Sequence, residues 1–513
     1  MDGRLPGNDQ RKEKRAHHAP IAEAMRAYAE DGALAFHTPG HKQGLGAHAL
    51  LRKLVTPEGL REEVSLMEEL DDLHEPTMCI REAQELAAEL YGADQAYFMI
   101  NGTTGAIHAM LMGSLCPGDT VFVPRNAHRS VIGGLILSGA RPVFIQPEID
   151  ERLGIAMGLT AAAVKAAIDA HPEARALVLV HPTYYGVTFD LSVLAKLVHA
   201  HGMLLLVDEA HGPHLRFSGE LPPQALDCGA DIVAQSTHKM LGSMTQTSIL
   251  LAKGPRVHFE RLREAASLLQ STSPNQLLLA SLDIARLQMA EDGERLVGRA
   301  VRLARQLRAG INEIDGLWSF GPEYVRRPGA SALDETKVTV TVTGLGLTGV
   351  EAEAILRHTY KIQCELSDAR NVLFIISYAD TERETSYLLH ALQELAAHHR
   401  SGDGEGRFDV PPLPPLPGVG CSPRLAFFAR KEPVPFAAAA GRVAAEQVMF
   451  YPPGIPILCP GDHIDEASLH YIRYMQELGL KVVGPQDASL QHLQVLVDDS
   501  THVQDEEKRY GYE

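Results

Sequence analysis

A lysine that follows a short apolar segment has the surroundings best suited to chemistry in this chain. Residues 232–234 predict a buried strand, and the polar residues 235–238 connect this strand to Lys239. Earlier in the chain, the apolar segment 204–207 leads directly into Asp208. In open α/β sheets, ligands bind at the carboxyl ends of the strands, so we expect both side chains at one edge. Lysine at such an edge can form a Schiff base with an aldehyde.

The pairing of Lys239 with Asp208 indicates which aldehyde this would be. A carboxylate that keeps a pyridine nitrogen protonated is the second half of a pyridoxal 5'-phosphate site, because it makes the ring an electron sink. A lysine after a core strand is more often a surface residue, and Lys239 alone would carry no such prediction. Together with a phosphate-type loop upstream, the two residues favour the cofactor site.

That loop is Asn101-Gly-Thr-Thr-Gly-Ala106, between the predicted strand 95–100 and the start of a helix. Glycines allow a ligand close to the backbone, and the N-terminus of a helix favours a phosphate. The loop matches neither the nucleotide triphosphatase motif nor the dinucleotide motif. Its residues Gly102, Thr103 and Thr104 are the predicted phosphate ligands, with Ser236 and His238 in support.

Several histidines also follow predicted strands. His128 comes after strand 120–123 and could stack on the cofactor ring, although an ordinary loop histidine is equally consistent with the sequence. His211, three positions after Asp208, could orient that carboxylate or cap a helix. His37 and His41 are four apart, but Pro39 and Gly40 between them forbid a regular helix. This spacing therefore favours a polar loop beside a pocket over a metal site.

Composition limits the classes of function that remain. The 513 residues are 45% hydrophobic and 22% charged, as in a soluble globular protein, and the net charge of −18 argues against binding nucleic acid or an anionic membrane. The same charge is compatible with a cationic substrate. Six scattered cysteines without a C-x-x-C pair suggest reduced thiols and a cytoplasmic protein. We expect neither a signal peptide nor a membrane-spanning helix.

The order of elements predicts an α/β fold. Apolar strands alternate with helical segments, which is typical of a mostly parallel sheet covered on both faces. The predicted strands are 95–100, 120–123, 142–145, 176–180, 204–207, 232–234 and 248–251. Helical patterns follow over 275–315. A smaller α+β region then has strands 337–342 and 372–377 and helices 349–359 and 383–397.

The sequence predicts five regions. They are an N-terminal arm (1–25), a large cofactor-binding domain (26–315), a small α+β domain (316–400), a Gly/Pro-rich linker (401–418) and a C-terminal α+β domain (419–513). In the last region we expect helices at 435–440 and through Tyr471, and a charged tail from Asp498.

Five motifs in order give the chain a resemblance to a known family. They are His37-Thr-Pro-Gly-His-Lys, Asn101-Gly-Thr-Thr, Asp208-Glu-Ala-His-Gly, Ser236-Thr-His-Lys and Tyr451-Pro-Pro-Gly-Ile-Pro. The chain resembles the Orn/Lys/Arg decarboxylases (group III, fold type I) in their short form without an N-terminal wing domain. The resemblance covers residues from about 20 to about 480. One departure is the run Pro76-Thr-Met-Cys79, where the family commonly has a glycine after Pro-Thr.

This resemblance implies a pyridoxal phosphate-dependent decarboxylation of arginine, lysine or ornithine to the corresponding amine, as in polyamine biosynthesis. It also implies a homodimer with active sites at the interface. The distal cation of the substrate needs an anionic partner, and the candidates are Glu365, Asp368 and Asp72. Each of them could equally be a solvated carboxylate, and the sequence leaves the choice of basic amino acid open.

Two other classes of protein remain as alternatives. Aminotransferases and α-oxoamine synthases of fold type I share the lysine and the aspartate, but they usually need an arginine for the substrate carboxylate. Arg370 is the available residue, and no motif surrounds it. A catalytically silent pyridoxal-binding or scaffold protein is the second alternative. The presence of Lys239, Asp208 and His128 argues against it.

Overall fold

The computed structural model describes residues 17–65, 67–399, 413–450 and 455–497. Most of the predicted arm and linker, the Tyr451-Pro-Pro-Gly454 part of the fifth motif and the charged tail lie outside these residues. The chain forms two compact units. The first consists of Met1–Ser114, Val207–Gly219 and Pro223–Val297, and the second of Leu115–Leu206, Glu220–Pro222 and Gly298–Glu513.

The central sheet has the strand order β1-β10-β9-β8-β6-β2-β3. In this order the strands are Gln95–Met99, Ser248–Ala252, Ile232–Gln235, Leu204–Asp208, Ala176–Val180, Thr120–Pro124 and Arg141–Ile145. Strand β2 pairs in parallel with β3 and β6, whereas β10 is antiparallel to both β1 and β9. The predicted α/β fold with a mostly parallel sheet is confirmed, and the reversed direction of β10 is a departure from the regular βα alternation.

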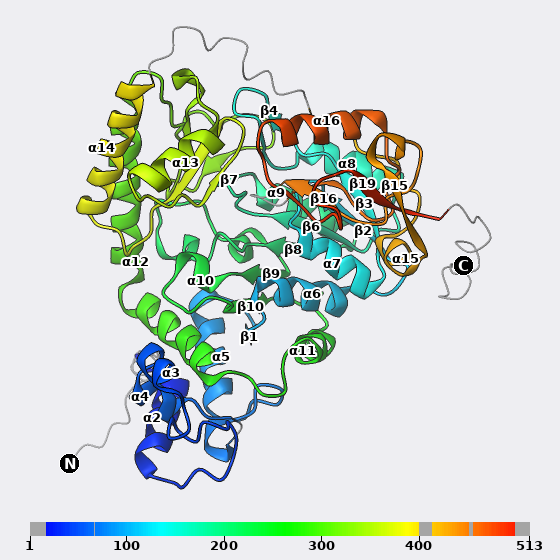
Figure 1. Ribbon diagram of the computed structural model, residues 1–513. Helices are drawn as coiled ribbons and strands as arrows, with labels where there is room; N and C mark the ends of the chain where they lie inside the picture. The colour runs from blue at the N-terminus through cyan, green and yellow to red at the C-terminus, as the bar shows by residue number, and fades with distance from the viewer. Residues whose placement is uncertain (1–16, 66, 400–412, 451–454, 498–513) are drawn as a thin grey trace. The chain divides into compact units, whose positions relative to one another are not determined.

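The first unit places helices beside β1, β10 and β9 (Figure 1). Helix α5 packs against α2 and β1, and α6 packs against α11 and β10. The helices are α2 (Pro20–Asp31), α3 (Ala49–Leu54), α4 (Pro57–Glu62), α5 (Cys79–Tyr91), α6 (Gly102–Ser114), α10 (Thr237–Met240) and α11 (Phe259–Leu268), with 3₁₀ turns Glu68–Leu70, Leu215–Phe217 and Ala225–Cys228.

Asp71 explains where helix α5 begins. Its carboxylate accepts hydrogen bonds from the backbone N–H groups of Thr77 (2.8 Å), Met78 (2.7 Å) and Ile80 (3.1 Å). Burial alone would favour the neutral acid, but these backbone donors outweigh it and lower the pKa of Asp71. The polar segment 70–76 therefore has a structural role within its own unit as the cap of α5.

The second unit contains β6, β2 and β3 of the central sheet, the first three residues of β8 and the smaller sheets. Helices α7 (Arg129–Ser138), α8 (Ala161–Ala170) and α9 (Leu191–Ala200) accompany β2, β3 and β6. Its short strands are β4 (Ile149–Asp150), β5 (Ile155–Ala156), β7 (Val187–Thr188) and β11 (Ala332–Leu333). Strands β4 and β5 pair with each other, and β11 pairs with β7.

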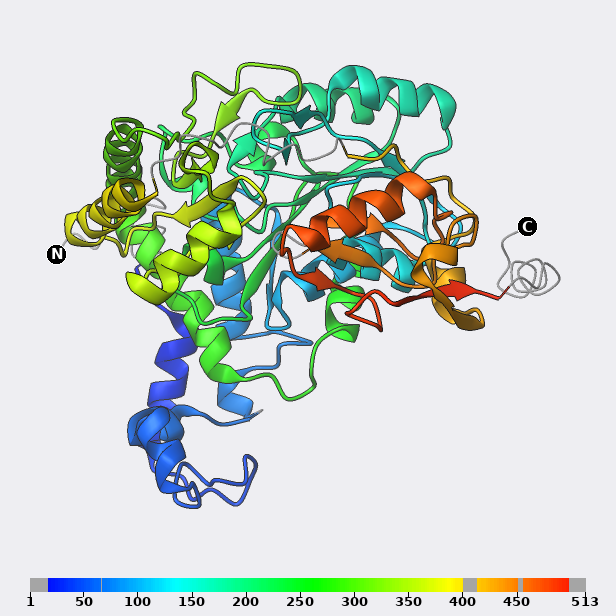
Figure 2. The same cartoon turned by 45° about the horizontal axis from the view of Figure 1, so that its top comes forward.

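The predicted small α+β region is present. Its antiparallel sheet β12-β14-β13 (Lys337–Thr341, Asn371–Ile375, Leu366–Ser367) lies with α13 (Gly349–Thr359) and α14 (Glu382–His398), which Figure 2 shows in yellow and yellow-green. Helix α12 (Gln276–Asn312) contributes Leu303 and Leu307 to the same core, in which Val338 and Val340 are fully buried. The helical pattern predicted over 275–315 is confirmed by α12.

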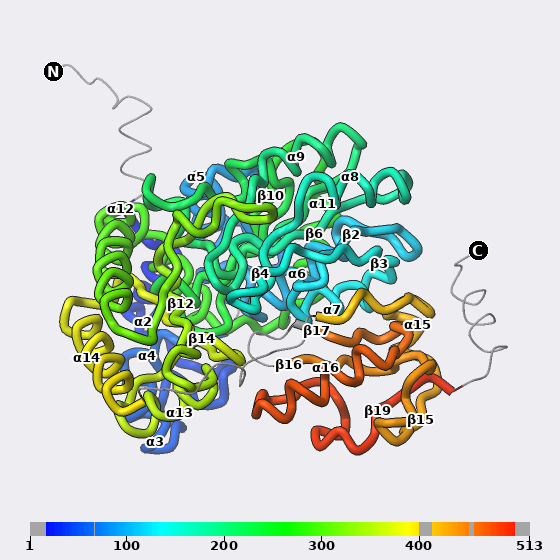
Figure 3. Tube along the Cα trace, turned by 90° about the horizontal axis from the view of Figure 1, so that it is seen from above, coloured from blue at the N-terminus to red at the C-terminus, as the bar shows by residue number. Residues whose placement is uncertain are grey.

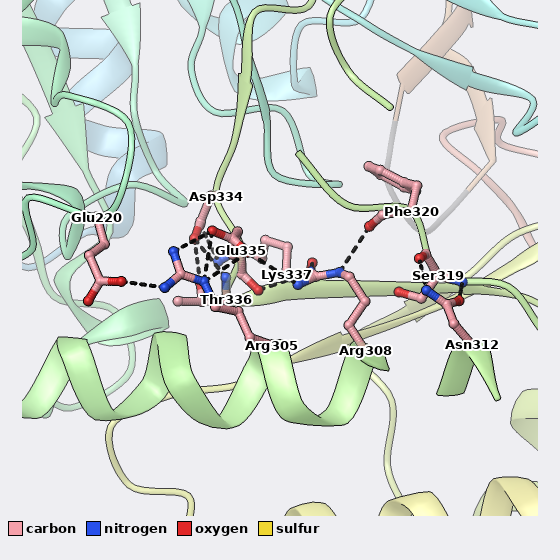
Figure 4. Close-up of polar contacts among 10 residues, drawn as sticks. All are labelled: Glu220, Arg305, Arg308, Asn312, Ser319, Phe320, Asp334, Glu335, Thr336 and Lys337. Atoms are coloured by element: carbon pink, nitrogen blue, oxygen red, sulfur yellow. Dashed lines mark hydrogen bonds and ion pairs between the residues drawn. The ribbon is translucent and has the colours of Figure 1, made fainter. Parts of the chain in front are cut away.

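Buried charges join α12 to the segment before β12 (Figure 4). Arg308 donates from Nε to the carbonyl oxygen of Phe320 (2.9 Å) and from Nη2 to those of Glu335 and Lys337 (3.0 Å each). Lys337 Nζ lies 3.5 Å from Asp334, and both side chains are fully buried. Arg305 pairs with the carboxylate of Glu335 at 2.7 Å and with Glu220.

The C-terminal part forms two small sheets beside α15 (Pro423–Phe428) and α16 (Glu466–Glu477), labelled in Figure 3. The strand orders are β15-β19 and β17-β16-β18, with bounds Lys431–Pro435, His492–Leu496, Ile455–Leu458, Val448–Phe450 and Val482–Val483. The predicted helix through Tyr471 is confirmed. The helix predicted at 435–440 is wrong, because β15 extends to Pro435 and only the 3₁₀ turn Phe436–Ala438 follows before Gly441. Among all the described residues, no helix has the length and apolar character needed to cross a membrane.

Candidate active site

Lys239 lies on the short helix α10, directly after β9, as the sequence predicts. Its side chain is exposed, and Nζ lies 3.1 Å from Nε2 of His211. A protonated lysine donates this hydrogen bond, which places the proton of the neutral imidazole on Nδ1. His211 thus orients the lysine amine, whereas the sequence suggested that it orients Asp208 or caps a helix.

Asp208 ends strand β8 and is only 4% exposed. Oδ1 accepts a hydrogen bond from the backbone N–H of Ala210 at 3.1 Å, and within the described residues Oδ2 accepts none. Burial raises the pKa of Asp208, and the nearby charge of Lys239 partly offsets this effect. A buried carboxylate with one oxygen uncommitted is suited to accept a hydrogen bond from a protonated ring nitrogen.

The phosphate-type loop is at the N-terminus of α6, after β1. Gly102 has a φ of 66°, and a Cβ there would have no atom within 4 Å, so this side of the loop is open. Thr104 is exposed on the first turn, while Thr103 is buried. The first-turn amides of a helix lack intrahelical acceptors, so this open turn offers N–H donors and a hydroxyl to an anion.

Two of the predicted phosphate ligands are engaged with each other inside the first unit. The Thr103 hydroxyl lies 2.5 Å from that of Ser236 and 2.9 Å from that of Ser248. His238 has its Nδ1 2.6 Å from the carbonyl oxygen of Thr247, and burial together with Lys239 lowers its pKa. These contacts join the first turn of α6 and the start of α10 to the start of β10.

Taken together, these residues fit pyridoxal phosphate, the cofactor that the family implies. An accessible amine at Lys239, an uncommitted carboxylate oxygen at Asp208 and an open helix N-terminus at Gly102 match its aldehyde, its ring nitrogen and its phosphate. All three groups belong to the first unit. The site therefore has one group for each of these three parts of the cofactor.

The other predicted site residues have different surroundings. His128, in the second unit, caps α7, and its Nδ1 accepts from the N–H of Ser130 at 3.3 Å. Glu365 is exposed, and its carboxylate has no partner among the residues described. Asp368 accepts hydrogen bonds from Tyr185 Oη (2.6 Å) and from the backbone around Asn371. Asp72, in the first unit, accepts from the N–H of His74 at 2.9 Å.

Glu209 is a buried carboxyl that the sequence did not single out. It is fully buried, Oε1 accepts from the N–H of Ala225 (2.7 Å), and Oε2 accepts from Nε2 of Gln235 (2.7 Å). Burial raises its pKa to about 8. The sequence could have indicated this residue. Glu209 directly follows Asp208, and consecutive side chains along a strand point to opposite faces of the sheet.

Comparisons with known proteins identify the family of this chain. A family model described as the Orn/Lys/Arg decarboxylase major domain matches residues 19–384, and the model of the C-terminal domain matches residues 424–485. Arginine decarboxylase of Halalkalibacterium halodurans is 44% identical over 482 residues, covering 94% of this chain and 98% of that protein. Arginine decarboxylase of Bacillus subtilis is 41% identical over 480 residues, covering 94% and 98%.

Solved structures match over similar lengths. The lysine decarboxylase of Francisella novicida has a TM-score of 0.80 at 22% identity, covering 94% of this chain and 82% of that one. Alanine–glyoxylate aminotransferase of Nostoc has a TM-score of 0.51 at 17% identity, covering 63% and 88%. At these identities the likeness concerns the fold.

The family models and the relatives define this protein as an amino-acid decarboxylase. Because the major-domain model covers well over half of the chain, the chain belongs to the Orn/Lys/Arg decarboxylase family.

Proposed function

We propose that the protein is a pyridoxal phosphate-dependent decarboxylase of a basic amino acid, with arginine as the first substrate to test. The observation that carries this proposal is the group formed by Lys239, His211 and Asp208, with an amine and an imidazole 3.1 Å apart beside a buried carboxylate. Arginine comes first because the relatives that are 41–44% identical over nearly their full length are named arginine decarboxylase.

Each residue of the site has a defined task. When bound, the cofactor supplies an electron sink for the pair released as the bond between Cα and the carboxylate breaks. Lys239 would hold it through its aldehyde, and Asp208 would keep the ring nitrogen protonated. The first turn of α6 with Thr104 would hold the phosphate, and His128 is proposed to stack on the ring.

His211 has a further task at the lysine. Since Nε2 accepts from Nζ, it fixes the direction of the amine and can take up a proton from it. A lysine relieved of one proton is the nucleophilic form that a Schiff base requires. Among the candidate partners of the substrate cation, Glu365 is the one whose carboxylate is exposed and uncommitted. Asp368 and Asp72 remain candidates with hydrogen bonds of their own.

Product identification tests this function against its rivals. The protein, saturated with pyridoxal phosphate, is incubated separately with arginine, lysine and ornithine, and CO₂ and the amine are measured. We expect CO₂ and agmatine from arginine in equal amounts. Keto acid without CO₂ would indicate an aminotransferase, and no product from any of the three would contradict the proposal.

We also propose that the protein acts as a homodimer in the cytoplasm. Six large apolar side chains of the segment 34–54 are exposed in the first unit, which is unusual for a surface that meets only water. They are Leu34 (82%), Phe36 (91%), Leu45 (81%), Leu50 (72%), Leu51 (39%) and Leu54 (81%). A second copy of the chain is the occupant that the family resemblance favours.

A further inference from the structure

The second unit contains a cavity whose lining includes none of Lys239, His211 and Asp208. Its volume is about 120 Å³, and its walls come from the end of β2, the β4–β5 hairpin, the segment 413–417 and the C-terminal elements β16, β17 and α16, which are labelled in Figure 3. Most of the lining is apolar, including Ile149, Ile155, Phe450, Ile457 and Leu480. An apolar cavity of about 150 Å³ is large enough to bind benzene, so this one has room for a five-membered ring.

A buried arginine lines the cavity and does not use all its donors. Arg125 is 8% exposed, and its guanidinium stacks over the Phe144 ring at 4.7 Å. Both of its hydrogen bonds come from Nη2, to the carbonyl oxygen of Ile457 (2.7 Å) and to Asp462 (2.6 Å). In the part of the chain that the structure describes, Nη1 is buried without a partner. A buried donor of this kind is stabilised by any acceptor that reaches it.

The lining also includes an acceptor and a hydroxyl. Tyr185 and Asp368 both line it, and the Tyr185 hydroxyl donates to Oδ2 of Asp368 at 2.6 Å. The Asp368 carboxylate also accepts from the N–H groups of Arg370 (2.7 Å) and Asn371 (2.8 Å). The lining thus contains both an arginine and a hydrogen-bonded pair of a hydroxyl and a carboxylate.

The charges around the cavity argue for a neutral occupant. Asp462 already neutralises Arg125 at 2.6 Å, so a carboxylate bound there would add an uncompensated buried charge. An ammonium group would be attracted by Asp368 but would have to displace hydrogen bonds that this carboxylate already accepts, and it would leave Nη1 of Arg125 without an acceptor. A hydroxyl or carbonyl oxygen meets the arginine without either cost.

We propose that this cavity is a binding site for a small neutral molecule with a compact apolar body and one hydroxyl or carbonyl group. The apolar body fills the space between Ile149, Phe450 and Leu480, and the oxygen accepts from Arg125. Because Asn126 also lines the cavity and lies two positions before His128, the occupied site braces the turn that carries this histidine.

The test uses four molecules that share one ring and differ in one group. Cyclopentanol, cyclopentane, cyclopentylamine and cyclopentanecarboxylate are titrated into the full chain saturated with pyridoxal phosphate, and binding is followed by ligand-observed NMR. We expect cyclopentanol to bind with a Kd of roughly 1 mM, which is reasonable for six heavy atoms. The other three should bind at least tenfold more weakly. Equal binding of cyclopentane, or tighter binding of either charged probe, would overturn the neutral-acceptor assignment.

A pair of variants locates the binding. Ala156 lines the cavity, and Ala156→Leu fills part of it, whereas Ala166→Leu adds the same side chain to the exposed face of α8. Cyclopentanol binding should weaken at least tenfold in Ala156→Leu and stay unchanged in Ala166→Leu, with both variants folded by circular dichroism. Should Ala156→Leu not fold, Met475→Trp at the α16 wall replaces it. Unchanged binding in the folded cavity variant, or no binding to the unmodified protein, would refute the site.

Discussion

At the scale of single residues, we expect the proposed site to depend on two side chains with different tasks. Lys239→Ala should lose the covalent attachment of the cofactor and nearly all turnover, because it removes the amine that lies 3.1 Å from Nε2 of His211. Asp208→Asn should keep the attachment but lose at least about a hundredfold in rate, since an amide no longer stabilises the protonated ring nitrogen. Reduction with borohydride followed by peptide mapping measures the attachment. A labelled peptide without Lys239 would contradict the assignment.

Glu209 gives a prediction about pH. Its pKa is about 8 in the folded protein against 4.5 for an ordinary glutamate, so the folded state keeps a proton that the unfolded chain loses. The stability contributed by this proton is complete below pH 4.5 and is lost as the pH rises to about 8. Glu209→Gln carries no proton to lose, and the Gln235 amide can flip to accept from its NH₂ group.

We therefore expect the melting temperature of Glu209→Gln to rise relative to the unmodified protein between pH 5 and pH 8. The difference in stability should change by up to about 1.4 kcal/mol per pH unit within that window. Differential scanning calorimetry at four pH values measures it. If the difference in melting temperature between the two proteins stays the same at all four pH values, Glu209 is ionised when buried.

The two carboxylates near residue 366 should respond differently to substitution. Glu365 is exposed and uncommitted, so Glu365→Gln should raise KM for the basic amino acid while leaving cofactor binding intact. A contact between an exposed carboxylate and a cation is worth about 0.2–1 kcal/mol, so KM should rise by up to about fivefold. Asp368 holds the turn before Asn371, so Asp368→Asn should mainly lower the melting temperature. An unchanged kcat/KM in Glu365→Gln would assign the cation to another carboxylate.

The sequence was informative at the residue scale where a side chain follows directly from a strand. Lys239 and Asp208 were predictable because strand ends in α/β sheets place residues at a common edge. The pairing of His211 with Lys239, and of Thr103 with Ser248, depends on which strands are neighbours and how deeply each turn is buried. One sequence does not contain that information.

At the scale of elements, buried charges hold α12 to the segment before β12 (Figure 4). Arg308→Met should destabilise the second unit by about 3 kcal/mol, because three backbone carbonyls lose a buried donor. Arg302→Met is the matched control, since Arg302 is exposed on the same helix. Fluorescence of Trp318, the single tryptophan, follows thermal unfolding. Equal melting temperatures for the two variants would refute this role of Arg308.

The periodicity of apolar residues predicted most elements. It failed where contacts between residues distant in the sequence determine the structure. Helix α13 begins and ends where the apolar pattern predicts, because Thr348 and Glu351 form a capping box in the sequence itself. The reversed β10 could not be predicted, since a buried strand has the same apolar pattern in either direction. The alanine-rich segment 436–440 favours a helix by propensity, but it lies between β15 and Gly441 and forms only a single turn.

At the scale of the whole molecule, the family models support a break between a large N-terminal part and a C-terminal domain. The first model ends at residue 384 and the second begins at 424, on either side of the proposed linker 401–418. The two compact units divide the chain differently, because residues 207–219 and 223–297 join the N-terminal segment in one unit. Lys239 and Asp208, which we propose as catalytic residues, belong to that first unit.

The exposed apolar segment 34–54 leads to a prediction about assembly. Leu50 and Leu54 are 72% and 81% exposed on α3, and we expect them to be covered by a second copy of the chain. The double substitution Leu50→Lys and Leu54→Lys would place two cations in that interface, and an unpaired buried charge costs several kcal/mol. The dimer should therefore dissociate, which sedimentation velocity measures.

Leu268→Lys is the control for this experiment, because Leu268 is also 72% exposed in the first unit but lies on α11, outside the segment 34–54. It should sediment as the unmodified protein does. If the partner also completes each active site, the double variant should lose decarboxylation in parallel with dissociation and regain it at protein concentrations that restore the dimer. A monomeric unmodified protein with full activity would contradict the proposed assembly, and a dimer unaffected by both lysines would move the interface away from α3.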